Sequence, residues 1–197
     1  HDTDRLFIAA ELPGAVAAMY RGELTAMDAG GAVDGVKDGR YGFHTGGDPN
    51  PWWQVDLGAP VALDRIVIYN RLDYAPGLNN ANKLRMLRSV DGETWSLDHD
   101  QPNRFFGGMD EVGPLVVDLR GVEGRYLRLQ IPSDAGILYH LDEVEVYGVA
   151  QPELNIALGR PASQSSARAI SGAPEGVGFP VQVRTAVRRN PATTASV

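Results

Sequence analysis

Residues Arg40–Asp73 read RYGFHTGGDPNPWWQVDLGAPVALDRIVIYNRLD, and this stretch decides the fold. Apolar and polar residues alternate over 52–58, which is typical of a strand with one buried face. Three apolar side chains share the face that we expect to point into a core: Trp53, Val55 and Leu57. A turn is predicted at Gly58–Pro60, and a second strand at 65–70. The stretch therefore predicts two neighbouring strands of one sheet.

Polar residues that core packing does not explain flank these two strands. His44 lies before the first strand, in a loop rich in Gly and Pro, and Arg71 and Asp73 follow the second strand. If the two strands lie side by side, His44 and Arg71 can meet at the same end of the sheet. The sequence therefore predicts a polar site on a rigid scaffold.

Six segments in all are predicted as main strands, joined by turns rich in Gly and Pro: 52–57, 65–70, 83–88, 115–119, 125–130 and 143–147. They predict an all-β protein in which residues 1–149 form one β-sandwich. A further strand is expected over 5–12, and residues 13–27 fit a short helix or an irregular loop equally well.

Composition and charge limit the classes of function. The chain has 197 residues, of which 43% are hydrophobic, enough for one core plus extensions. Its net charge of −7 argues against a nucleic-acid partner, because phosphates demand a basic face. No run of about 18 apolar residues occurs, so no membrane span is predicted. Cysteine is absent, which excludes disulfides. The chain opens at His1, and we interpret it as an extracellular, secreted protein whose signal peptide has been removed.

Five ordered blocks resemble the discoidin or coagulation-factor type C domain: Ala32–Gly35, Pro51–Gly58, Ile66–Asp73, Ser89–Trp95 and Glu143–Gly148. The resemblance covers roughly residues 30–148. It implies a jelly-roll β-sandwich of the galactose-binding-domain-like type.

Within that superfamily the chain is similar to the fucose-binding F-type lectins, because 26 residues separate His44 from an Arg-x-Asp motif. In those lectins a histidine, the arginine and a further basic residue hold the sugar. The resemblance thus implies that His44 and Arg71 bind a sugar, since both side chains donate hydrogen bonds to its oxygens. Asp73 would fix the guanidinium by a charge-assisted hydrogen bond.

The segment after Asp73 departs from the family pattern. The third basic residue should follow within a few positions, but YAPGLNNAN (74–82) precedes Lys83. Lys83 is the candidate for this role, with Arg85 as its substitute, and Tyr74 offers an apolar platform. The resemblance therefore implies a site for fucose or a related sugar.

The same resemblance implies a structural calcium ion. In related lectins the turn that corresponds to 32–39 holds the ion, together with the acidic residue that opens the final strand. Four residues would supply oxygen ligands here: Val36 and Asp142 by their carbonyls, Asp38 and Glu143 by their carboxylates. An Asx-type turn without a metal is the alternative interpretation.

Residues 150–197 are predicted to be a linker, Gln151–Leu154, and a non-globular extension. The segment 155–166 resembles the first strand of another discoidin module, yet too little chain follows for a second sandwich. A lone strand seeks a sheet edge, either on its own sandwich or on a neighbour's. The short linker favours the neighbour, which would produce a filament.

No catalytic motif is recognisable, because a Gly-rich phosphate loop, His-Glu-x-x-His and Gly-x-Ser-x-Gly are all missing. The sequence therefore predicts a non-catalytic, lectin-like module that binds a glycan or polysaccharide and carries calcium. The alternative is a structural subunit of an extracellular filament that self-assembles through residues 150–197.

Overall fold

The computed structural model describes residues 28–167, so the strand expected over 5–12 and the segment 13–27 lie outside the described residues. Ten strands make up this part: β1 (Phe43–Asp48), β2 (Trp52–Tyr69), β3 (Arg85–Ser89), β4 (Ser96–Asp100), β5 (Leu115–Asp118), β6 (Glu123–Gln130), β7 (Ile137–Leu141), β8 (Glu143–Gly148), β9 (Gln151–Asn155) and β10 (Ala162–Gln164). Two short 3-10 turns accompany them, η2 (Gly31–Val33) and η3 (Ala75–Gly77). All strand pairings are antiparallel. The all-β sandwich predicted from the sequence is confirmed. No helix within 28–167 has the length and apolar character needed to cross a membrane.

The long strand β2 organises the sheets, and here the prediction of two strands around a turn was wrong. Residues 52–69 form one continuous strand with a bend. Gly58 adopts φ +89°, and the pairing with β6 shifts register between Asp56 and Val61. A left-handed residue with a bulge redirects a strand without ending it, so the expected turn becomes a bend.

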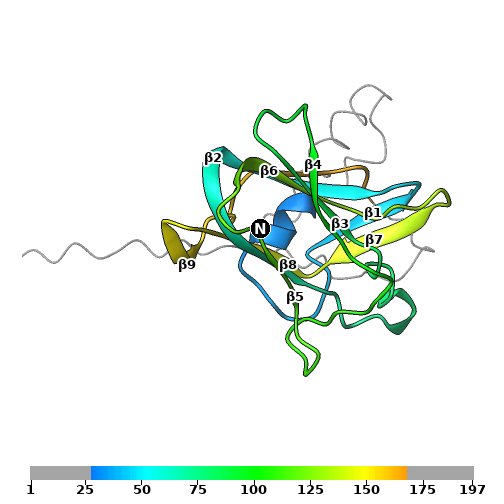
Figure 1. Ribbon diagram of the computed structural model, residues 1–197. Helices are drawn as coiled ribbons and strands as arrows, with labels where there is room; N and C mark the ends of the chain where they lie inside the picture. The colour runs from blue at the N-terminus through cyan, green and yellow to red at the C-terminus, as the bar shows by residue number, and fades with distance from the viewer. Residues whose placement is uncertain (1–27, 168–197) are drawn as a thin grey trace, which may run out of the picture.

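The bend distributes the two halves of β2 between different partners. The first half pairs with β6 and β10, and the second half pairs with β8 and β5. Strands β4 and β3 extend the sheet beyond β6, and β9 extends it beyond β8. In Figure 1, β2 curves from the layer that contains β6 to the layer that contains β8 and β5.

The core lies between these layers and follows the predicted alternation. Trp53 and Val55 are 0% exposed and Leu57 is 3% exposed, as expected. From the second half of β2, Ile66 and Ile68 are buried in the same cluster. The indole Nε1 of Trp53 donates to the carbonyl of Ala29 at 2.9 Å, so its one polar atom has a partner inside the core.

Consecutive strands β7 and β8 join the two ends of the decisive stretch. On β7, His140 pairs with His44 and Leu141 pairs with Phe43. Directly after it, the N–H of Asp142 donates to the carbonyl of Tyr69 at 2.9 Å, and β8 continues along β2. His44 therefore lies within a strand and not in the loop expected from its Gly and Pro neighbours.

The segment after Gly148 folds back on the same chain. Strand β9 pairs with β8, and β10 pairs with β2 from Ala162 opposite Val55 to Gln164 opposite Trp53. Between them Ala157 is 0% exposed. Two arrangements were considered for 155–166: pairing with its own sandwich or with that of a neighbouring chain. In the structure this segment pairs with its own sandwich, although the short linker favoured the neighbouring chain. The linker is short because β8 and β9 form a tight hairpin, which reverses the chain at once. Residues 150–167 thus belong to the sandwich, and β10 already occupies the edge of β2.

A buried charge in this last segment tests the fold-back. Ala157→Asp should lower the free energy of unfolding by about 3 kcal/mol, because a carboxylate would enter the core without a partner. Ala150→Asp, at an exposed position of the hairpin, is the matched control and should change stability by less than about 0.5 kcal/mol. Urea unfolding followed by tryptophan fluorescence measures both. Equal stabilities would contradict the packing of the segment.

Candidate functional site

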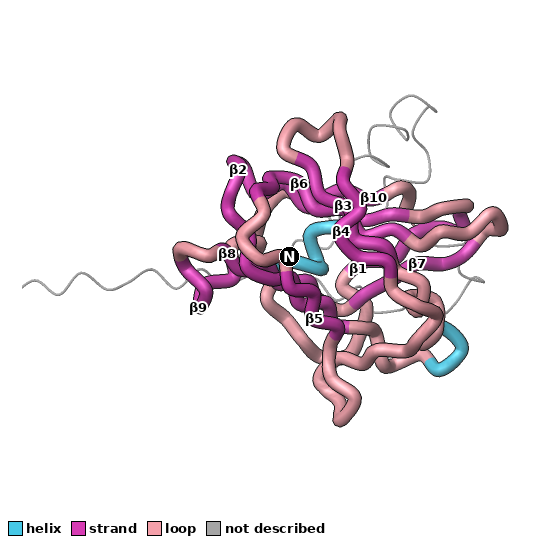
Figure 2. Tube along the Cα trace, viewed as in Figure 1, coloured by secondary structure: helices cyan, strands magenta, loops and turns pink. Residues whose placement is uncertain are grey.

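A group of polar and aromatic side chains gathers around β1 and β7 and the segment that follows β2. Figure 2 shows β1 and β7 on one side of the molecule, with loops beside them. We call this group the His44–Arg71 site, and its members are Tyr41, His44, Arg71, Asp73, Tyr74 and His140. They come from β1 and the residues before it, from the segment after β2, and from β7.

Arg71 is the centre of the site. Its guanidinium lies over the rings of Tyr41 and Tyr74, with 4.8 and 5.0 Å from Cζ to the ring centroids. Its Nε donates to Oδ1 of Asp73, which fixes the plane of the group. The residue is only 8% exposed, yet its Nη groups donate no hydrogen bond to any residue within 28–167. A held arginine with available donors is suited to a ligand that carries oxygen acceptors.

His44 contacts the same tyrosine as Arg71, and the main chain orients its ring. Its Nδ1 lies 2.7 Å from the carbonyl oxygen of Thr45. Because a carbonyl only accepts, Nδ1 is the donor in this hydrogen bond and carries a proton. The ring of Tyr41 meets the His44 ring edge-on at 5.7 Å and also contacts Arg71. One tyrosine thus contacts both His44 and Arg71, which 26 intervening residues separate in the sequence.

His140 is a member of the site that the sequence did not identify. Its ring centroid lies 5.1 Å from that of His44, and the residue is 2% exposed. Burial, together with the nearby charges of His44 and Arg71, lowers the pKa of His140 to about 3, so its imidazole is neutral in the folded protein. No motif in the sequence points to His140, because only the pairing of β1 with β7 places it beside His44.

The long loop 74–82 packs against His140. Asn70 donates its Nδ2 hydrogens to the carbonyls of Leu78 and Phe106, at 3.0 and 2.9 Å, and Asn80 donates to Leu138 at 2.8 Å. A Cβ at Gly77 would lie 2.7 Å from Nε2 of His140, so only glycine allows this approach. The loop is therefore a fixed wall behind the histidine pair.

The structure brings together four of the five residues predicted for the sugar: His44, Arg71, Asp73 and Tyr74. It places Lys83 elsewhere, exposed in the turn before β3, without a hydrogen bond, ion pair or cation–π contact to the described residues. Its substitute Arg85 pairs with Asp100, 3.2 Å from Nε to Oδ2. Neither residue contacts the His44–Arg71 site.

Of the residues predicted for calcium, Asp142 and Glu143 lie at the junction of β7 and β8, and Val36 and Asp38 lie in the loop 34–39. Asp142 and Glu143 are both 0% exposed. Oδ2 of Asp142 accepts the N–H of Gly39 at 2.8 Å, and Oε1 of Glu143 accepts the N–H of Gly35 at 2.9 Å. Asp38, which is exposed, accepts the N–H of Arg40 in the manner of an Asx turn.

Glu143 carries the feature that fits a cation. Its Oε2 is buried without a hydrogen-bond partner in the described part of the chain. Burial raises the pKa of this carboxyl to about 8, and the charges of Asp34 and Glu145 act in the same direction. Within 28–167, no three acidic, histidine or cysteine side chains come together as a metal site. A cation here would therefore depend on backbone carbonyls, as the prediction for Val36 and Asp142 requires.

Comparison with known proteins agrees with this architecture. A family model of the F5/8 type C domain matches residues 18–143. No curated protein sequence matches the chain. A fucolectin from striped bass (Morone saxatilis) serum is 27% identical with a TM-score of 0.51, over 63% of this chain and 43% of that chain. The lectin domain of lectinolysin, solved with Lewis B antigen, is 26% identical with a TM-score of 0.50, over 61% of this chain and 83% of that chain.

The Streptococcus pneumoniae fucose-binding module SpX-3 shares 32% identity, with a TM-score of 0.49, over 59% of this chain and 81% of that chain. The family match extends over more than half of the chain and includes strands β1 to β7 and the six residues of the site. On this basis the chain belongs to the F5/8 type C domain family.

Proposed function

We propose that this chain is a non-catalytic carbohydrate-binding module whose His44–Arg71 site takes fucose or a related sugar. The observation that carries the proposal is Arg71, a buried arginine held by Asp73 and two tyrosines, whose Nη donors have no acceptor within 28–167. The similar structures support it, since one is a fucolectin and another is a lectin domain in complex with Lewis B antigen.

The chemistry of the site suits a sugar ring. The Nη groups of Arg71 donate to hydroxyl or ring oxygens, and the imidazole of His44 adds a hydrogen bond to a hydroxyl. Tyr41 and Tyr74, 47% and 45% exposed, offer ring surface to the apolar face or methyl group of the sugar. Each hydrogen bond replaces one to water and contributes only about 1 kcal/mol net. Affinity per site is therefore weak, and Asp73 acts through Arg71 instead of touching the sugar.

The number of carboxyl groups in the site supports sugar binding without hydrolysis. Glycoside hydrolysis needs two carboxyl groups on either side of the scissile bond. Asp73 is the one carboxylate among the six residues of the site, and its Oδ1 already accepts from Arg71. We place the module outside the cell, where domains of this family typically occur. A filament subunit is the weaker alternative, because the strand that would join a neighbour is paired within the chain.

Substitutions in the site test sugar binding. Arg71→Ala and His44→Ala should each weaken binding of L-fucose at least about tenfold, because each removes hydrogen bonds and leaves the others misplaced. Arg71→Lys should also weaken it, since an ammonium lacks the planar fork. Arg85→Ala is the matched control, an arginine paired on the sheet away from the site. Isothermal titration calorimetry and a glycan array provide the measurements. If the intact protein binds no sugar, or if Arg85→Ala weakens L-fucose binding as much as Arg71→Ala does, the proposal is wrong.

We also propose a structural calcium ion at the loop 34–39, held by the carboxylates of Glu143 and Asp38 and the carbonyls of Val36 and Asp142. The support is the buried Oε2 of Glu143, which has no hydrogen-bond partner in the described part. A bound cation would supply the positive charge that allows this carboxyl to ionise in the core. The ion would fix the loop and would take no part in holding the sugar.

The pKa of Glu143 gives this proposal a measurable sign. When a chelator removes calcium, the Glu143 carboxyl of the folded protein keeps its proton at pH values where the unfolded chain has released it. The reason is that the pKa of Glu143 is about 8 in the folded protein and 4.5 ordinarily. Stability from this group is full below pH 4.5 and is lost as the pH rises through 8. Calcium should replace the proton, so the Tm gain on adding calcium should grow between about pH 5 and pH 8. For a protein of this size, about 1 kcal/mol of added unfolding free energy raises the Tm by about 2–4 °C.

Glu143→Gln is the matching variant, since it keeps the shape and removes the charge. In differential scanning calorimetry, this variant should show neither the loss of stability as the pH rises nor the increase in Tm on adding calcium. Glu153→Gln, on the exposed strand β9, should leave both unchanged. A calcium gain that survives in Glu143→Gln would place the ion elsewhere.

A further inference from the structure

Gln164, the last residue of β10, reaches from the C-terminal segment to the main chain of His44. Its Nε2 donates to the carbonyl of His44 at 3.3 Å and to Oδ2 of Asp28 at 2.7 Å. The same oxygen of Asp28 accepts the N–H of His44 at 3.0 Å. Gln164 is 5% exposed, so these hydrogen bonds lie inside the protein. Two side chains from opposite ends of the described chain thus hold both main-chain groups of His44.

These contacts close the outer edge of β1. Within 28–167, β1 pairs with β7 alone, so its second edge has no partner strand. Main-chain groups at such an edge need other partners when they are buried. Asp28 and Gln164 supply them for His44, and Oγ of Ser166 accepts the N–H of Gly46 at 2.8 Å. The segment 164–166 therefore completes the edge of the strand at the residue that contributes to the sugar site.

The amide of Gln164 is oriented to donate. Three oxygens surround its Nε2, and two of them are the carbonyls of His44 and Ser166, the second at 2.6 Å. Carbonyls only accept, so the nitrogen of the amide faces them. Its own Oε1 is buried without a hydrogen-bond partner in the described part of the chain. An unpaired buried oxygen is costly, which shows that the surroundings fix the nitrogen of Gln164 in this position.

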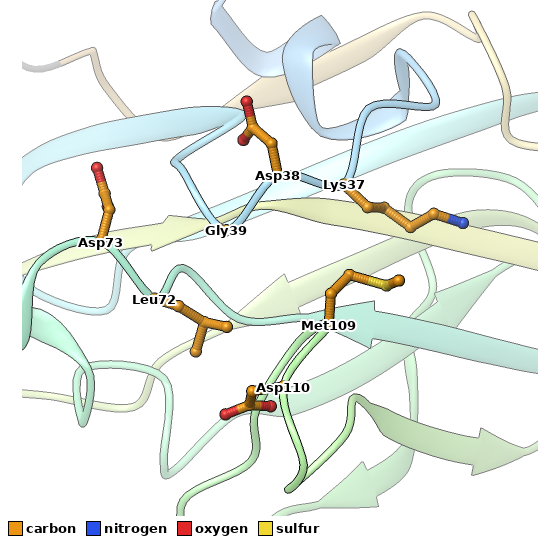
Figure 3. Close-up of a pocket in the computed structure, with 7 residues that line it drawn as sticks. All are labelled: Lys37, Asp38, Gly39, Leu72, Asp73, Met109 and Asp110. Carbon is orange, nitrogen blue, oxygen red and sulfur yellow. The ribbon is translucent and has the colours of Figure 1, made fainter.

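The other half of the site is anchored by different elements. The N–H groups of Leu72 and Asp73 donate to the carbonyl of Gly39, at 2.7 and 3.0 Å. Figure 3 shows Gly39 beside the segment that carries these two residues. Within 28–167, no hydrogen bond or ion pair joins residues 151–167 to residues 71–74. A change at Gln164 should therefore reach the sugar through His44 and leave Arg71 in place.

We propose that Gln164 is a positioning residue of the sugar site, which acts through the main chain of His44. The inference rests on the proposed function. The ring of His44 follows the main chain closely, because its Nδ1 donates to the carbonyl of Thr45, the next residue, at 2.7 Å. Gln164 lies beyond residues 18–143, which match the family model. The C-terminal segment thus acts in sugar binding as well as in the fold.

Gln164→Met tests this role, since it keeps the length of the side chain and removes its hydrogen bonds. Calorimetry well below the Tm should show L-fucose binding about fivefold weaker, because the free protein no longer holds His44 in place. Asn155→Ala is the matched control on the same segment. Its Oδ1 accepts the N–H groups of Val146 and Ala157, at 3.1 and 3.0 Å, and does not contact His44. This variant should lower the Tm by about 2–4 °C but keep L-fucose affinity within about twofold.

NMR of the histidine rings provides a readout that lower stability alone would not change. The nitrogen shifts of His44 report its hydrogen bond to Thr45. His99, whose Nε2 lies 2.9 Å from Oε1 of Gln101, is the internal control. Gln164→Met should shift the His44 signals and leave those of His99 in place. Asn155→Ala should shift neither.

Asp28 gives a test by conservative replacement. Asp28→Ala removes the acceptor for the N–H of His44, so it should weaken L-fucose binding about fivefold, as Gln164→Met does. Asp28→Asn keeps an oxygen that can accept from both His44 and Gln164, so its affinity should stay within about twofold of the wild type.

The negative results are distinguishable. If Arg71→Ala abolishes L-fucose binding but Gln164→Met binds as the wild type does, the positioning role is wrong and the proposed function stands. The role is also wrong if Asn155→Ala weakens binding as much as Gln164→Met, since the effect would then be one of stability. If the wild type binds no sugar, the proposed function fails, and the positioning role fails with it.

Discussion

The hydrogen-bonded junction of β7 and β8 is the constraint on which the rest of the structure depends. β7 pairs with β1, and one residue later the chain pairs with the end of β2. Two ladders that share one short turn leave His44 and Arg71 no freedom to separate. The packing at this point is tight, because the N–H of Gly42 donates to the carbonyl of Leu141 at 2.8 Å. A Cβ at Gly42 would lie 2.2 Å from the carbonyl oxygen of Asp142, so any larger residue would force the ladders apart.

The same junction also carries two buried acids, Asp142 and Glu143, which precede and open β8. Taking carboxylates out of water is unfavourable unless hydrogen bonds or charges compensate. Here the N–H groups of Gly35 and Gly39 donate to Glu143 and Asp142. Glu145, two positions further along, receives hydrogen bonds from Lys37, Tyr69 and Tyr147. These bonds offset part of the cost of burial and also set the course of the loop 34–39.

Around Arg71 the protein has fixed a long, flexible side chain before any ligand binds. The ion pair with Asp73 sets the orientation of the guanidinium, and the two tyrosine rings restrict its position. Such pre-organisation reduces the conformational entropy that binding would otherwise lose. The loop 74–82, which interrupts the family pattern, takes part as a wall: its Gly77 packs on His140, and His140 packs on His44. The chain therefore surrounds the arginine with two tyrosine rings, one of which also contacts His44.

The sequence alone determined the class of fold, because alternation along a strand depends only on which side chains face the core. It placed Trp53, Val55 and Leu57 inside, and its motifs singled out His44, Arg71 and Asp73. Pairing between distant strands is not local, so the tertiary structure alone decided what lies opposite each residue. It turned the expected hairpin into the bent strand β2, set His140 beside His44 through the register of β1 with β7, and left Lys83 outside the site. It also returned residues 155–166 to their own sandwich, because the β8–β9 hairpin reverses the chain within a linker that looked too short.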